Sequence, residues 1–289
     1  MRSQSVKAQA TTLLASLMFA LMAFLVKVLS VNLSGAEILF IRAIISILLL
    51  GAVLLFVFKG RLRIRNLNML MVRGLFGGFA VLLYFTAISR IPLSSAAMLA
   101  NAYPVFAILF SVIIVKERPN LDSLFVLLLA FGGMFLILEP RFGKIDIGYF
   151  MALAAAVFGG VAVASIRELR KTDSSWMITL AQMVGAALFS LALLPGRFVV
   201  PDARQWGLLL LVGILGTGAQ LAFSKPFKFL PTAEGSMVAP VYTAFTVVLA
   251  VLFLGEVMTL RLVMGFFLVF GSIMYLLARE EVKFRRHLL

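Results

Sequence analysis

Two stretches of this sequence, IPLSSAAMLANAYPVFAILFSVIIVKE at residues 91–117 and LPTAEGSMVAPVYTAFTVVLAVLFLGE at residues 230–256, are versions of one another. Each begins with a proline at its second position, has a tyrosine near its middle and ends on a glutamate. A single shift of 139 residues, which places Pro92 on Pro231 and Glu117 on Glu256, also aligns residues 83–138 with 222–277 without a gap. Apolar composition alone does not explain matched prolines, tyrosines and glutamates, so the pattern indicates an internal repeat.

The whole chain is as apolar as these two stretches. Of its 289 residues 63% are hydrophobic and the mean hydropathy is +1.10, whereas an average soluble domain is about 45–50% apolar. This composition excludes an ordinary soluble enzyme, because too few charges are present to cover the apolar surface. It also argues against nucleic acid as a partner, although 26 Lys and Arg against 12 Asp and Glu give a net charge of +14.

Charged residues divide the chain into ten charge-free runs of 16 to 25 residues. Roughly 20 apolar residues cross a bilayer as a helix, and hydrocarbon offers no water to satisfy a loose backbone. We therefore expect an all-α polytopic membrane protein with ten transmembrane helices. The predicted spans are about 10–31, 34–58, 68–89, 92–115, 121–139, 146–167, 175–195, 204–225, 231–254 and 260–279.

The loops predict the orientation. With the N-terminus in the cytoplasm, the inner segments hold 17 Lys and Arg and the outer segments hold six, which is a positive-inside bias. Both termini are then cytoplasmic in a multi-pass protein of the cell (inner) membrane. Five spans per repeat is an odd number, so the repeats, residues 1–140 and 141–289, must lie in opposite orientations. Such inverted repeats are typical of secondary transporters, whose site lies near the midplane between the halves.

The two quoted stretches are followed by FGG at residues 131–133 and FGS at residues 270–272, and together they resemble the EamA-type carriers of the drug/metabolite transporter superfamily. The segments EILFIRA (37–43) and VRGLFGG (72–78) also fit that family. The resemblance implies two inverted five-helix repeats (5+5) around a central cavity, and a carrier of small metabolites rather than an enzyme. One departure is Thr243, which stands where the first repeat has Pro104, so the halves are not expected to line the cavity equally.

Three cations lie within predicted spans, where an ionisable group marks a candidate functional site. Arg42 lies about 12 Å from the outer face, too deep for its guanidinium to reach the interface. For Lys27 snorkelling to the interface and a role at the site both stay open, and for Arg73 snorkelling is favoured. Glu37 is about 140° from Arg42 around the helix, so we expect it to pair with Lys27 instead.

Arg42 is then left without a carboxylate, and a buried guanidinium needs an acceptor. A backbone carbonyl, a tyrosine hydroxyl or the anionic group of a substrate could serve. We favour a substrate with a carboxylate or phosphate, such as an amino acid. No Asp or Glu lies near the midplane, which weakens the alternative of proton-driven export of lipophilic cations.

Polar residues and prolines occur together in the spans 92–115 and 231–254. Because proline lacks an N–H, Pro104 and Pro240 free the carbonyls of Ala100 and Ser236, which is tolerated beside a cavity; a simple packing kink is the alternative. Other polar residues could merely bridge helices. The predicted substrate-binding residues are Arg42, Lys27, Tyr84, Asn101, Tyr103, Gln182, Gln220, Tyr242 and Thr243, with Pro104 and Pro240 as helix breaks that line the cavity.

Glycines and two glutamates have predicted structural roles. Gly74-x-x-x-Gly78 and the glycines at 213, 216 and 218 are expected to let helices pack closely. Glu117 and Glu256 lie between a helix end and the next helix start, where anchoring or N-capping is favoured over ion coupling.

Chemistry limits the other classes of function. The sequence has one histidine, His287, and no cysteine, and it contains no Asp-rich metal motif, nucleophile elbow or phosphate loop. We therefore expect no cofactor, no metal and no enzymatic activity. The expected function is a secondary transporter that moves an amino acid or other anionic or zwitterionic metabolite by alternating access, as a monomer or homodimer. A carrier of a larger, vitamin-like or drug-like molecule, a channel and a lipid flippase stay open as alternatives.

Overall fold

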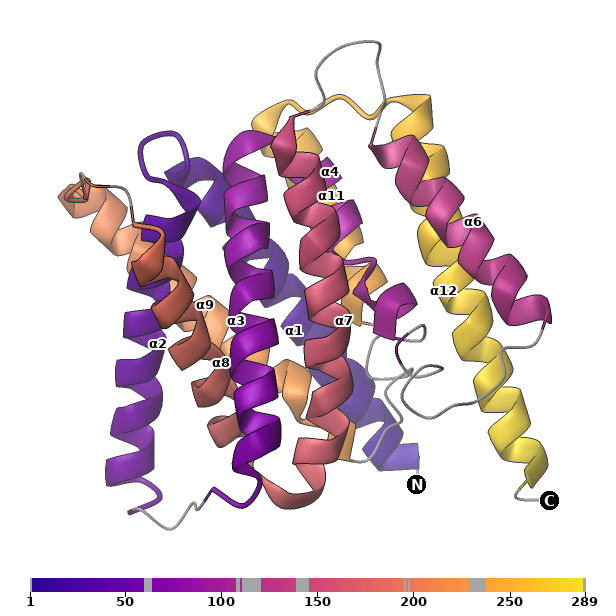
Figure 1. Ribbon diagram of the computed structural model, residues 1–289, viewed down its shortest axis with the longest axis horizontal. Coiled ribbons are helices and arrows are strands. Elements are labelled where there is room, and N and C mark those ends of the chain that lie inside the picture. Colours follow the sequence, from indigo (N-terminus) through magenta and orange to yellow (C-terminus); the bar gives the residue numbers. More distant parts are fainter. Residues whose placement is uncertain are drawn as a thin grey trace.

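The computed structural model describes residues 2–59, 64–107, 110, 121–138, 146–194, 196, 198–228 and 238–287 of the chain. Within these ranges every regular element is a helix (Figure 1). The helices are α1 (Arg2–Leu29), α2 (Gly35–Phe56), α3 (Leu67–Arg90), α4 (Leu93–Ala100), α6 (Leu121–Ile137), α7 (Ile147–Thr172), α8 (Ser175–Ala192), α9 (Ala203–Ser224), the 3₁₀ turn η1 (Pro226–Lys228), α11 (Val238–Leu254) and α12 (Leu260–His287).

Each of these α-helices falls on one of the ten predicted spans. The main difference lies in the span 92–115, where α4 ends at Ala100 and a second helical segment begins at Tyr103. Asn101 leaves the helical conformation with φ −82° and ψ 4°, and Pro104 cannot donate to the carbonyl of Ala100. The chain therefore leaves the helix directly before Pro104. Of the span 231–254, only the part from Val238 onward lies within the described residues.

The packing of the helices repeats itself between the two halves. The 139-residue shift places α1, α2, α3 and α6 on α7, α8, α9 and α12, and it places the predicted span 92–115, which contains α4, on the span 231–254, which contains α11. Accordingly, α3 packs along α7 as α9 packs along α1, and α4 packs against α7 as α11 packs against α1. The helices α6 and α12 correspond to each other and lie side by side at one edge of the bundle (Figure 1). An approximate two-fold axis therefore relates the halves.

The direction of the helices makes this repeat an inverted one. α1 starts at the end of the molecule where both chain termini lie (Figure 1). α7, its counterpart, ends there: Asp173, directly after α7, accepts hydrogen bonds from the backbone N–H groups of Arg65 and Asn66, 3.0 and 3.1 Å, at the start of α3. The two counterparts thus run in opposite directions, as predicted for five spans per repeat.

The outer surface of the bundle suits lipid. Among the described residues, α2, α3, α7, α8 and the segment Ala203–Lys228 are long and apolar enough to cross a bilayer, and four shorter apolar helical segments accompany them. Large apolar side chains on several of these helices are exposed, among them Leu48, Leu188, Phe253 and Phe267. So many exposed apolar side chains would be an aggregation hazard in water, but they are the normal surface of a membrane-spanning bundle.

Close helix packing depends on glycine where α3 crosses α8. The backbones of Gly74 and Gly185 are in direct contact, and a Cβ at Gly78 would lie 2.5 Å from the backbone nitrogen of Ala186. Any larger residue would force the helices apart. The predicted packing role of Gly74 and Gly78 is therefore confirmed.

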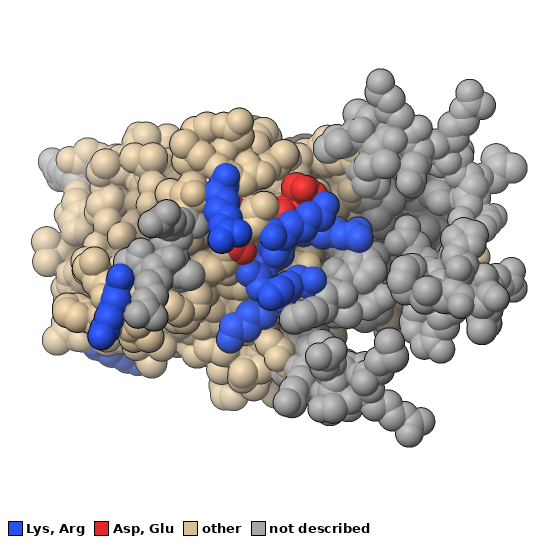
Figure 2. Space-filling view, turned by 90° about the horizontal axis from the view of Figure 1, so that it is seen from below, with Lys and Arg blue, Asp and Glu red and all other residues tan. Residues whose placement is uncertain are grey.

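Cations gather at the end of the molecule that holds both termini. Figure 2 views this face and shows Lys and Arg side chains clustered over it. The described cations at this end include Lys59 after α2, Arg65 before α3, and Arg167, Arg170 and Lys171 in the last turns of α7. The opposite end has fewer described cations, among them Arg90, which pairs with Asp146 at 3.2 Å.

Candidate functional site

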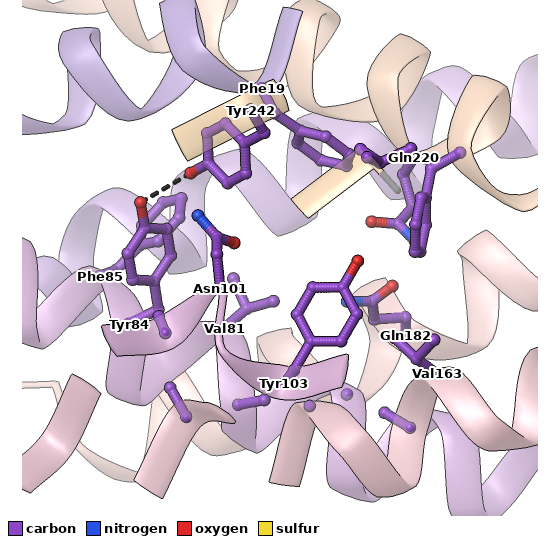
Figure 3. Close-up of a pocket in the computed structure, with 18 of the residues that line it drawn as sticks. Phe19, Val81, Tyr84, Phe85, Asn101, Tyr103, Val163, Gln182, Gln220 and Tyr242 are labelled. Atoms are coloured by element: carbon purple, nitrogen blue, oxygen red, sulfur yellow. Dashed lines mark hydrogen bonds between the residues drawn. The ribbon is translucent and has the colours of Figure 1, made fainter. Parts of the chain in front are cut away.

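A cavity of about 130 Å³ lies between the two repeats. On the same measure one water molecule needs roughly 10–15 Å³, so the cavity has room for a small organic molecule. Both repeats contribute to its wall: α1, α2, α3 and the end of α4 on one side, and α7, α8, α9 and α11 on the other. Its described polar lining residues are Arg42 and Arg73, together with six that Figure 3 labels: Tyr84, Asn101, Tyr103, Gln182, Gln220 and Tyr242.

Arg42 on α2 is one of two cations in this wall. Its side chain is buried, and its Nε and Nη1 atoms have no hydrogen-bond partner among the described residues. The guanidinium carbon lies 5.3 Å from the centre of the Phe85 ring, within the range of a cation–π interaction. Room for it is made by Gly216 on α9, where a Cβ would lie 2.5 Å from Nε. Arg42 is thus buried within the protein, and its depth in the membrane stays a prediction.

Arg73 on α3 is the second cation, and the expectation that it snorkels to the interface is wrong. Its side chain is buried and lines the same cavity, because α3 packs between α7 and α8 and presents this position to protein rather than to lipid. Nη2 donates to Oε1 of Gln182 on α8 at 2.5 Å, while Nε has no partner among the described residues. The predicted binding residues do not include Arg73, although its charge within a predicted span marked it as a candidate.

Three tyrosines surround the cavity. The hydroxyls of Tyr84 on α3 and Tyr242 on α11 are hydrogen bonded at 2.6 Å and join the two repeats. Figure 3 shows Tyr103 directing its hydroxyl toward the space faced by the amides of Gln182 and Gln220. Tyr103 and Tyr242 are equivalent under the repeat, so the matched tyrosines of the two quoted stretches both reach the cavity.

Asn101 enters the wall because the chain breaks there. Its side-chain amide donates to Oγ1 of Thr243 at 3.0 Å, and Thr243 donates in turn to the carbonyl of Ala239 at 2.9 Å. Thr243 is fully buried behind the wall rather than in it. Pro104 and Pro240 also lie outside the set of lining residues, although Ala100, whose carbonyl Pro104 leaves free, is among them.

Lys27 and Glu37 do not pair with each other, so that expectation is wrong. Lys27 donates to the carbonyls of Ile88 and Ile91, both at 2.8 Å, and so caps the end of α3, where carbonyls lack helical partners. Glu37 forms a capping box with Ser34 and accepts from the backbone N–H of Val199 at 2.7 Å. Each side chain thus satisfies backbone groups whose proximity the sequence does not reveal. Lys27 is not among the residues that line the cavity.

Glu256 lies at the opposite end of α11 from the cavity. Its carboxylate accepts hydrogen bonds from the backbone N–H groups of Leu93 and Ser94 and from the Ser94 hydroxyl, at 2.5, 3.0 and 2.5 Å. The predicted N-capping role is confirmed, and the capped helix is α4 of the other repeat. Glu117, its counterpart, lies outside the described residues.

The cavity therefore presents two guanidinium groups, amides and hydroxyls, set among aromatic and small apolar residues that sequence reasoning did not name, including Phe19, Met22, Gly77 and Phe85. Its described lining contains no Asp or Glu, and the described part of the chain has no group of three or more His, Cys, Asp or Glu side chains able to hold a metal ion. Such a site can bind an anionic group by charge-assisted hydrogen bonds.

Known proteins resemble this chain along most of its length. The profile of the EamA-like transporter family matches residues 7–139 and again residues 146–278. The pseudopaline exporter CntI of Pseudomonas aeruginosa is 32% identical over 217 residues, which is 74% of this chain and 76% of that protein. An uncharacterized transporter of Helicobacter pylori is 27% identical over 247 residues, 79% of each chain. A crystal structure with 21% identity superposes with a TM-score of 0.67 over 95% of this chain and 98% of the other, which shows a shared fold.

Proposed function

The chain belongs to the EamA-like transporter family, and on that premise we propose that it is a secondary transporter of a small anionic or zwitterionic metabolite. Membership makes it a multi-pass membrane transporter and not an enzyme. The substrate class, which includes amino acids, and the alternating-access mechanism are our proposals. Its proposed location is the cytoplasmic membrane.

The observation that carries the substrate class is Arg42. Its guanidinium is buried in the cavity between the repeats with two unpaired nitrogens. Leaving a charge buried without a partner is costly, so a site of this kind favours a ligand that supplies the missing anion. A carboxylate can accept two parallel N–H bonds from a guanidinium, whereas a cationic drug would be repelled.

The remaining contacts follow from the wall of the cavity. Tyr84, Asn101, Tyr103, Gln182, Gln220 and Tyr242 offer hydroxyls and amides to the rest of the substrate. Substrate binding by Lys27 and Thr243 stays a prediction. In the structure the polar groups of both side chains donate to backbone carbonyls.

Alternating access is supported by the symmetry of the packing. The cavity has walls from both inverted repeats, so a rocking of one repeat against the other would exchange which end is open while the same residues stay at the centre. The same residues would then bind the substrate whichever end of the cavity is open.

We further propose that both termini are cytoplasmic and that the direction of transport is export. The cation-rich face of Figure 2 is the one that holds the termini, and the positive-inside bias places such a face in the cytoplasm. The name of the Pseudomonas aeruginosa relative describes an exporter, which favours the same direction here.

Uptake of radiolabelled compounds into proteoliposomes tests this proposal. The panel contains amino acids, other carboxylates, nucleosides, vitamins and cationic drugs. We expect saturable uptake of a carboxylate-bearing compound, and its loss to at most a tenth in Arg42→Ala, because the anion loses its partner. Arg204→Ala is the matched control, since Arg204 is exposed at the start of α9. Full activity of correctly inserted Arg42→Ala, or transport of cationic drugs alone, would contradict the proposal.

A further inference from the structure

We infer that the substrate has two anionic groups, one bound at Arg42 and the other at Arg73; this inference rests on the proposed transport function. Both guanidiniums line one cavity and both are buried, with exposed fractions of 1% and 2%. Each keeps unpaired donors among the described residues: Nε and Nη1 of Arg42, and Nε of Arg73. One carboxylate satisfies one guanidinium, so a single anion leaves the second cation uncompensated.

Arg73 contacts an amide of the other repeat, and Arg42 contacts a glycine that lies one helical turn before another amide. Arg73 on α3 donates to Gln182 on α8. Arg42 on α2 lies against Gly216 on α9, and Gln220 follows one turn later with its Nε2 atom buried and unpaired. Both cations therefore come from the first repeat and both amides from the second. These are two similar half-sites, each able to hold an oxyanion between a guanidinium and an amide.

The charge of the wall selects against a simple zwitterion. An amino acid with one carboxylate would place its ammonium group in a cavity that already contains two cations and whose described lining has no Asp or Glu. Like charges in a buried site repel strongly. A second anionic group removes that repulsion and compensates the second guanidinium, so dicarboxylates and carboxylate-rich metabolites fit best.

Much of the rest of the wall is apolar. Phe19, Phe85, Ala155 and Gly159 belong to it, and a Cβ at Gly159 would lie 3.4 Å from the Cβ of Tyr103. This surface suits a carbon chain that joins the two anionic groups. Both groups would then bind at contacts between the repeats, so an occupied site would hold the repeats together.

Binding to the purified full-length protein in detergent tests the inference. The probes are the dicarboxylates from malonate to pimelate, the monoamide of each, and inorganic phosphate, and the readout is the concentration that half-saturates the rise in unfolding temperature. For the best chain length, we expect the dicarboxylate to bind at least tenfold more tightly than its monoamide. Arg73→Met should abolish this preference, because the second carboxylate loses its guanidinium partner. Arg73→Lys, which keeps the charge, should retain part of the preference, and Arg204→Met is the control.

The possible outcomes separate this inference from the proposed function. If monoamides and dicarboxylates bind equally to the wild type, or Arg73→Met keeps the preference, the two-anion site is refuted while carboxylate transport stands. If phosphate binds as tightly as the best dicarboxylate, both guanidiniums hold one oxyanion and the inference fails. If no carboxylate binds at all, the proposed function fails with it. Should Arg73→Met not fold, the wild-type comparison and Arg73→Lys still decide.

Discussion

At the scale of single residues, Gly216 decides where the guanidinium of Arg42 lies. A Cβ at this position would come within 2.5 Å of Nε and 2.8 Å of Nη2, and the backbone of α9 cannot move away without disturbing its packing on α1 and α2. The flexible arginine must yield instead. The position of Arg42 in the proposed binding site thus depends on the absence of a side chain at residue 216.

Gly216→Ala should therefore impair transport without unfolding the protein. We expect uptake to fall at least tenfold while the unfolding temperature changes by only about 2 °C, because the end of a flexible side chain moves at small cost. Gly271→Ala, where a Cβ meets nothing within 4 Å, is the matched control and should transport normally. Normal uptake by Gly216→Ala would show that the observed position of Arg42 is not needed.

The two cavity arginines show how far sequence reasoning reaches at this scale. Arg42 was predicted to bind substrate because its side chain cannot reach the membrane–water interface. Arg73 was missed because its depth in a span does not reveal that α3 lies between α7 and α8. Its hydrogen-bond partner, Gln182, is 109 residues further along the chain. Glu37 was paired wrongly for the same reason, since Val199 is 162 residues away. Contacts between residues far apart in the sequence arise from the fold, and the spacing of residues along the chain does not reveal them.

At the scale of elements, the start of α4 depends on a residue of the other repeat. Pro92 precedes this helix and offers no side-chain cap, so the first N–H groups of α4 would lack acceptors. Glu256 supplies them from the end of α11, and its negative charge also suits the positive end of the helix dipole. One carboxylate thus holds together two helices that both contribute to the cavity.

Replacing this cap should destabilise the protein. We expect Glu256→Gln to reduce the free energy of unfolding by about 1 kcal/mol, because the amide keeps a weaker acceptor and loses the charge. Thermal unfolding in detergent measures the change. Glu168→Gln is the control, since Glu168 forms an exposed pair with Lys171, and such pairs contribute little. Equal unfolding temperatures for Glu256→Gln and the control would refute a capping role.

The elements themselves were largely predictable. Charge-free runs located the helices because a charge inside hydrocarbon is costly, and Pro104 indicated the break after Ala100. The sequence did not indicate that the polar end of the last predicted span remains helical as far as His287, because polar sequence ends a span without ending a helix.

At the scale of the whole molecule, the distribution of Lys and Arg predicts which end faces the cytoplasm. The chain has no cysteine, so single replacements can be labelled without background. Ile64, 53% exposed, lies at the cation-rich end before α3, and Val200, 78% exposed, lies in the connection between α8 and α9 at the other end. An impermeant maleimide applied to intact cells should label Val200→Cys and spare Ile64→Cys until the membrane is opened. Labelling of Ile64→Cys in intact cells would reverse the orientation.

The symmetry of the molecule was predicted from a single alignment of the chain with itself. The shift of 139 residues placed α1, α2, α3 and α6 on α7, α8, α9 and α12, and the packed helix pairs exchange accordingly. The mismatch of Thr243 with Pro104 predicted an unequal lining, but it did not indicate that the arginines of the cavity belong to one half and its glutamines to the other. The two halves therefore differ in the residues that line the cavity, while their helices pack in equivalent pairs.

If one site between the repeats serves both sides of the membrane, as we propose, the protein must show counterflow. Proteoliposomes loaded with an unlabelled carboxylate substrate are diluted into labelled substrate, and the transient accumulation of label is recorded. We predict accumulation above equilibrium that saturates with concentration and disappears in Arg42→Ala. Flux that rises linearly with concentration and shows no counterflow would contradict the account and indicate a channel.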